Sequence, residues 1–145
     1  MPKIAAFGTV LKMGAGDTVP GPETFTNIAH VTNIGGPSLA LDTEDVTTHD
    51  STNAWEEVVP TILRTGEISL DIEYEPANDT QDATAGLLKK LKDKVLSNFQ
   101  MIFPDTGATE WDFTAYCTAF EPSAPHDGAL TATVKLKLDG APTLE

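Results

Sequence analysis

The residues that most often bind metals or act as nucleophiles are few in this chain. The histidines are His30, His49 and His126, and the single cysteine is Cys117. No histidine has the HExxH spacing or a neighbouring cysteine, so the sequence contains no recognisable zinc motif. Cys117 lies in a β-rich alternating segment, which is typical of a small core residue rather than of a nucleophile. We therefore expect neither a metal nor a cofactor.

Carboxylates are far more abundant and gather in two places. The segment Glu67–Glu75 alternates apolar and polar residues, which places Glu67, Asp71, Glu73 and Glu75 on one face of a strand. Paired carboxylates can serve acid–base catalysis when their environments separate their pKa values, but a solvated strand face explains the same pattern. A second cluster, Asp42–Asp45, lacks the spacing and the central glycine of an EF-hand calcium loop. The sequence contains neither a phosphate-binding loop nor a GxSxG motif, so we predict a protein that is not an enzyme.

The charge of the chain limits its partners. Its 145 residues include 9 Lys and Arg against 22 Asp and Glu, a net charge of -13. Such a chain is unsuited to neutralising nucleic-acid phosphates or to docking on an anionic membrane. The basic residues are also segregated, because four lysines lie within Thr80–Asn98. Segregation of this kind favours self-association, or an acidic surface that repels a polyanion.

The hydrophobic pattern predicts a mainly β fold. Strict alternation in Glu67–Glu75 and Leu130–Leu138 predicts strands with one buried and one wet face. An earlier strand is expected to stop at the turn Gly35-Gly36-Pro37. The clearest predicted strands cover residues 25–31, 67–75, 99–103, 111–120 and 130–138. A short extended stretch is expected at residues 5–11, and another strand is expected to start at residues 39–41. The length favours a single domain over residues 1–145.

One helix and one long loop complete the expected organisation. Apolar residues recur at helical spacing from Ala83 to Val95, and lysines occupy the opposite face. Asn78, Asp79 or Thr80 is expected to cap this helix. Residues 42–60 are polar and without helical period, which predicts a long loop of functional importance. The fold class is thus a β-sandwich or barrel of about six to eight strands with one flanking α-helix.

An ordered set of segments carries a resemblance to a known family. Phe25–Ser38 is a strand followed by a GGPS turn, and Asp45–Ser51 is similar to a DVTTxDS stretch. The set continues with Pro60–Gly66, the alternating strand, the helix, Phe103-Pro104-Asp105 and Phe120-Glu121-Pro122. In this order the chain resembles the tail tube (major tail) proteins of long-tailed bacteriophages.

The resemblance implies a structural role in the virion. The subunits are expected to form hexameric rings that stack into a hollow tail tube, assembled in the host cytoplasm, through which genomic DNA passes without specific binding. The expected partners are other copies of the chain and the tape measure, tail terminator and tail-tip proteins. The acidic lumen lining is expected at Glu67, Asp71, Glu73 and Glu75. The ring-to-ring contacts are expected from the long loop, at Asp45, Thr47, Thr48, His49, Asp50 and Trp55.

Two alternatives remain open at this point. One is another virion component with a similar fold, such as a decoration or connector protein. The other is a ligand-binding β-sandwich, which usually shows a cluster of exposed aromatic residues, whereas Trp55 and Trp111 lie far apart in the sequence. The lumen strand is also open between residues 67–75 and 130–138. The second choice brings Lys135 and Lys137 to the lumen or beside the acidic face.

Overall fold

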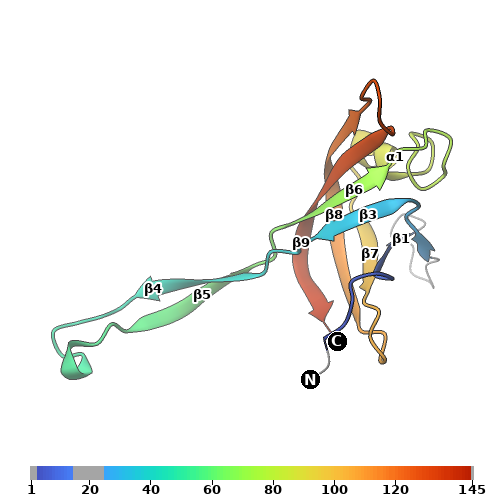
Figure 1. The fold of residues 1–145 in the computed structure, drawn as a ribbon. Helices are drawn as coiled ribbons and strands as arrows, with labels where there is room; N and C mark the ends of the chain where they lie inside the picture. The colour runs from blue at the N-terminus through green and yellow to red at the C-terminus, as the bar shows by residue number, and fades with distance from the viewer. Residues whose placement is uncertain (1–2, 15–24, 145) are drawn as a thin grey trace.

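The computed structural model describes residues 3–14 and 25–144, and these are mainly β (Figure 1). Seven strands form one sheet in the order β2-β1-β7-β8-β9-β6-β3, while β4 and β5 form a separate two-stranded sheet. Together with one α-helix in the described part of the chain, this confirms the expected fold class. The elements are β1 (Val10–Gly14), β2 (Phe25–Asn27), β3 (Val31–Gly35), β4 (Ala40–Asp45), η1 (Thr52–Ala54), β5 (Val58–Arg64), β6 (Glu67–Glu73), α1 (Leu87–Asp93), β7 (Ser97–Ile102), β8 (Glu110–Ser123) and β9 (Thr131–Leu144).

The large sheet is rolled so that its two edge strands meet at a corner. The edges are β2 and β3, and only residues 28–30 connect them. The Ile28 amide donates to Leu11 O (3.0 Å), and the Glu73 amide donates to His30 O (2.9 Å). Hydrogen bonds therefore join the corner to β1 near one edge of the sheet and to β6 near the other edge. The single strand expected over residues 25–31 is wrong, because His30 has a left-handed φ of 58° that interrupts it.

A buried glutamine holds this corner in place. Gln81 is 0% exposed. Its Nε2 donates to Ala29 O (2.7 Å) and Glu73 O (3.2 Å), and its Oε1 accepts from the Glu75 amide (2.7 Å). These bonds tie the loop after β6 to the corner and to the end of β6. Both the amide nitrogen and the amide oxygen of this buried side chain therefore have hydrogen-bond partners.

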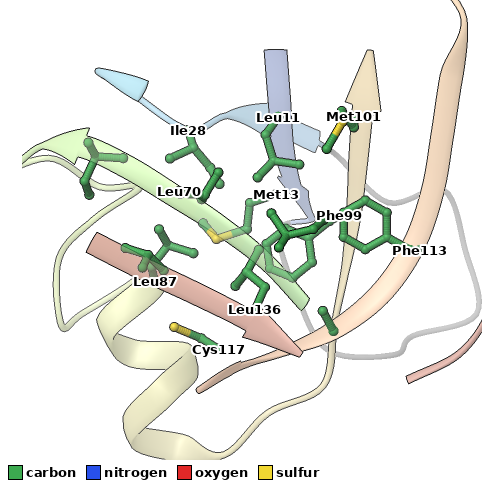
Figure 2. Packing of buried hydrophobic residues seen from close by; sticks show 14 of the residues in the cluster. Leu11, Met13, Ile28, Leu70, Leu87, Phe99, Met101, Phe113, Cys117 and Leu136 are labelled. Carbon is green, nitrogen blue, oxygen red and sulfur yellow. The ribbon is translucent and has the colours of Figure 1, made fainter. Parts of the chain in front are cut away.

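The core lies inside the rolled sheet (Figure 2). The alternation predicted for residues 67–75 and 130–138 is confirmed by the burial of one side-chain face on β6 and on β9. Strand β7 contributes Phe99, which stacks on Phe113 of β8 with ring centroids 5.9 Å apart. Burial of each large apolar side chain contributes about 1.5–3 kcal/mol. The buried residues of β6 and β9 are Ile68, Leu70, Ile72, Ala132, Val134, Leu136 and Leu138.

Cys117 of β8 belongs to this core, and burial raises the pKa of its thiol to about 11. The thiolate is the reactive form, so the native protein should react with a disulfide reagent at pH 8 about 100-fold more slowly than the unfolded chain. The measurement is the release of thionitrobenzoate with and without denaturant. Equal rates in the two states would contradict the burial of this thiol.

Helix α1 is shorter than the sequence pattern predicted. The expected start near Asn78–Thr80 is wrong, because the side chain of Asp82 accepts from the amides of Thr84, Ala85 and Gly86 and bends the chain into turns. Its expected continuation to Val95 is also wrong, because Lys94 adopts a left-handed φ of 58° and ends the helix. The helix packs on β8 with Leu87 fully buried. No helix among the described residues is long and apolar enough to cross a membrane.

Candidate assembly surfaces

Strands β4 and β5 form an arm that projects from the body of the molecule (Figure 1). We call residues 39–64 the arm. The loop predicted over residues 42–60 is therefore too long, since Thr43 pairs with Pro60 and Asp45 with Val58, leaving residues 46–57 as the tip. The sequence pattern indicated only a strand start at residues 39–41 and missed the rest of the ribbon, because its residues are largely exposed and show no alternation.

Two glycines set the direction in which the arm leaves the body. Gly36, in the predicted Gly35-Gly36-Pro37 turn, has a φ of 97°, and Gly66 has a φ of 68°. A Cβ at Gly36 would collide with Glu67 O, and a Cβ at Gly66 would lie 2.7 Å from Ser38 O. Only glycine fits both the conformation and the space at these positions. The root of the arm is therefore held close to the start of β6.

The tip of the arm is shaped by its own hydrogen bonds. Ser51 is 8% exposed, and its hydroxyl donates to a Glu57 carboxylate oxygen (2.7 Å) while accepting from the Thr48 amide (3.0 Å). The Glu57 amide donates to the Thr47 hydroxyl (2.7 Å), and the Val46 amide donates to Glu57 O (2.8 Å). The tip is therefore a formed knob at the end of the ribbon.

The six residues expected to make ring-to-ring contacts all lie at or beside this tip. Asp45 ends β4, and its carboxylate accepts from the Thr47 amide (2.9 Å). The hydrogen bonds from the hydroxyl and then from the amide of Thr47 lower the pKa of Asp45. Trp55 is 74% exposed. Five of the six side chains thus sit within residues 47–55, and all six residues are exposed: Asp45, Thr47, Thr48, His49, Asp50 and Trp55.

The arm also exposes apolar side chains, of which the sequence pattern had singled out only Val58 and Val59 beside Trp55. Leu63 is 80% exposed and is paired across the ribbon with Leu41. A two-stranded ribbon is at best marginally stable in water without packing against another surface. A large exposed apolar surface usually marks an interaction site. The other exposed apolar residues of the arm are Leu39, Val46, Val58, Val59 and Ile62.

The predicted acidic face lies on β6, which is flanked in the sheet by β9 on one side and β3 on the other. Glu67 and Glu73 are exposed, and Asp71 is half-buried between two donors: Thr133 Oγ1 at 3.2 Å and Asn33 Nδ2 at 3.4 Å. Glu75 lies beyond the end of the strand, where its carboxylate is 2.9 Å from His30 Nε2. Three of the four carboxylates therefore share one strand face, and the fourth is at the corner.

The two strands considered for the lumen are neighbours in the sheet. Glu67 pairs with Lys137, and Ser69 pairs with Lys135. Directly paired residues share a face, so the carboxylates of β6 and the lysines of β9 lie on the same outer surface. Whichever of residues 67–75 and 130–138 lines the lumen, the other segment lies beside it in the sheet. Within the described residues, no group of three or more histidine, cysteine or acidic side chains could hold a metal ion.

An apolar groove of about 520 Å³ runs between β3 and the segment before β1. Its walls include Ile34 of the edge strand β3, together with Met101 and Phe103. Phe7 lines the groove and is 96% exposed. An edge strand beside an apolar groove is a template for pairing with another chain.

The comparison with known proteins agrees with this architecture. Residues 12–145 match the family model of the lambda phage tail tube protein. A chain in the virion of a native gene transfer agent particle has 20% sequence identity and a TM-score of 0.76, with 99% of both chains covered. A chain in the tail of an empty gene transfer agent particle, refined with C6 symmetry, has 22% identity and a TM-score of 0.72, covering 93% of this chain and 95% of that one.

A third similar structure is the SPP1 tail tube, with 12% identity and a TM-score of 0.66, covering 94% of this chain and 77% of that one. Among curated proteins, none matches the chain in sequence. The solved structures are similar at low identity over nearly the whole chain, so they show a common fold. The family model adds a match in sequence over most of the chain.

Proposed function

The chain belongs to the lambda phage tail tube protein family, and from this membership we propose that its copies form hexameric rings that stack into the hollow tube of a virion tail. Tail tube proteins are structural components of the virion. The sixfold ring is supported by the C6 symmetry of the similar gene transfer agent tail. The stacking is inferred from the arm, whose apolar side chains are left uncovered by the described residues 3–14 and 25–144.

Two kinds of contact between copies are proposed. The arm reaches a neighbouring ring, with Asp45, Thr47, Thr48, His49, Asp50 and Trp55 at or beside its tip. Neighbours within a ring meet at the edge strand β3 and the groove that contains Phe7, because unpaired edges and exposed apolar surface favour association. A contact between the arm and a different surface of the next copy is the kind of interface that builds filaments.

The outer face of β6 is proposed to line the lumen, with Glu67, Asp71, Glu73 and the adjacent Glu75 as its acidic residues. A negatively charged lining repels DNA phosphates, so genomic DNA passes without binding. Lys135 and Lys137 beside these residues leave the face with charges of both signs. The proposed partners at the ends and inside the tube are the terminator, tail-tip and tape measure proteins, with assembly in the host cytoplasm and no catalytic activity.

Reversing charge on this face should make assembled tubes retain DNA. In Glu67→Lys/Glu73→Lys tubes, cations replace carboxylates on every subunit, and short DNA should cosediment with them at low salt but not with wild-type tubes. Tubes of Asp79→Lys/Asp127→Lys, with the same change in charge at exposed positions away from β6, are the control. Equal retention by the two variants would contradict the lumen assignment.

Negative-stain electron microscopy of the concentrated protein tests the tube itself. Hollow tubes or stacked rings of uniform diameter are the expected result, with tail-tip extract added if the protein alone does not nucleate. Monomers under both conditions would overturn the proposal, and would favour a decoration or ligand-binding role.

A further inference from the structure

Helix α1 presents a basic surface on an otherwise acidic protein. Four of the nine basic residues lie within α1 or at its C-cap. Lys90 is buried, whereas Lys89, Lys92 and Lys94 are exposed. Lys89 Nζ is 3.3 Å from an Asp93 carboxylate oxygen, so one acidic residue offsets part of this charge. Leu87 anchors the helix to the core, which leaves the lysines on a fixed support rather than on a loop.

The outer part of the arm has the opposite character. Residues 43–57 contain no lysine or arginine, and their acidic residues are Glu44, Asp45, Asp50, Glu56 and Glu57. The one arginine of the arm lies at its root, where Arg64 Nε is 2.6 Å from an Asp42 carboxylate oxygen. That pair neutralises the root and leaves the outer arm uniformly acidic.

The two charged surfaces cannot meet within one chain. In Figure 1 the arm extends to the lower left from the body, while α1 lies at the upper right. The arm strands bond to each other and to no other strand among the described residues. A contact between the outer arm and α1 must therefore join two copies, and it is heterologous, which allows it to repeat along an assembly.

We propose that the acidic outer arm of one copy docks on the lysine face of α1 in a second copy. This inference rests on the proposed tube function and names the surface that receives the arm. Opposite charges steer the encounter and fix its register, while two acidic arms repel each other. Trp55, exposed at the tip, supplies a large amphipathic contact whose ring face can accept a lysine ammonium.

Reciprocal charge reversal tests this contact. The helix variant is Lys89→Glu/Lys92→Glu/Lys94→Glu, and the arm variant is Glu44→Lys/Asp50→Lys/Glu56→Lys. Each variant should stay folded by circular dichroism and assemble at least about tenfold more slowly than wild type in light scattering, because like charges then face each other. An equimolar mixture of the two should assemble, because each reversed surface finds a complementary one on the other variant.

Controls separate this inference from the tube proposal. Asp79→Lys/Glu121→Lys/Asp127→Lys makes the same change in net charge as the arm variant at exposed positions outside the arm, and should assemble like wild type. If wild type forms tubes and the helix variant forms them at the same rate, α1 serves another partner and the inference is overturned. Failure of the mixture to assemble overturns it as well. Absence of tubes from wild type, with tail-tip extract present, overturns the tube proposal itself.

Discussion

Removing the tip of the arm should give a folded monomer that forms no tubes. The bond from the Val46 amide to Glu57 O marks where the ribbon can be closed, so replacing Thr47–Glu56 with the dipeptide Asn-Gly makes a tight hairpin turn there. Only exposed residues and the locally bonded Ser51 are lost. The core is untouched, and the midpoint of thermal unfolding should stay close to that of wild type. The shorter deletion of Thr47–Asn53 should also abolish assembly.

The measurement is tube formation by electron microscopy and sedimentation, together with circular dichroism of the monomer. Asn53→Gly is the control, because Asn53 already has a φ of 55° that glycine adopts without strain. The control should assemble normally. Tubes of normal dimensions from the shortened chain would show that the tip is dispensable, and would leave the exposed leucines of the ribbon as the main contact.

Gln81→Leu should cause the largest loss of stability of any single substitution considered. The leucine has a comparable volume but leaves the Glu75 amide and the Ala29 carbonyl without their partners. Each buried polar group left unpaired costs about 1–3 kcal/mol, so the free energy of unfolding should fall by about 3 kcal/mol or more. The corner between β2 and β3 should also loosen, since Gln81 is one of the side chains that bond it.

Chemical denaturation followed by tryptophan fluorescence measures this effect. Gln100→Leu is the matched control, because Gln100 is half-buried on β7, and its replacement should change the free energy of unfolding by less than about 0.5 kcal/mol. Equal midpoints for the two variants would show that the corner is held by packing alone and that the bonds of Gln81 contribute little.

Much of the body could be predicted from the sequence, because its signals are local. The alternation from Ile68 to Ile72 and from Ala132 to Leu138 is a property of neighbouring residues, and burial on one sheet face preserves it. The turn at Gly35–Pro37 is equally local. The resemblance to tail tube proteins rests on the order of several such segments, and the family match confirms it. The segregation of lysines and carboxylates is likewise visible without a structure.

The assembly surfaces depend on contacts between residues that are distant in the sequence, and only the tertiary structure decided them. Pairing of β4 with β5 turned a predicted loop into an arm, although neither strand alternates. The bond between Gln81 and Ala29 joins residues 52 positions apart, which no local pattern encodes. Sheet order placed Lys137 beside Glu67 and thereby decided the charge of the outer face. Local periodicity thus determined which residues face the core, while strand pairing determined which surfaces the molecule offers to its neighbours.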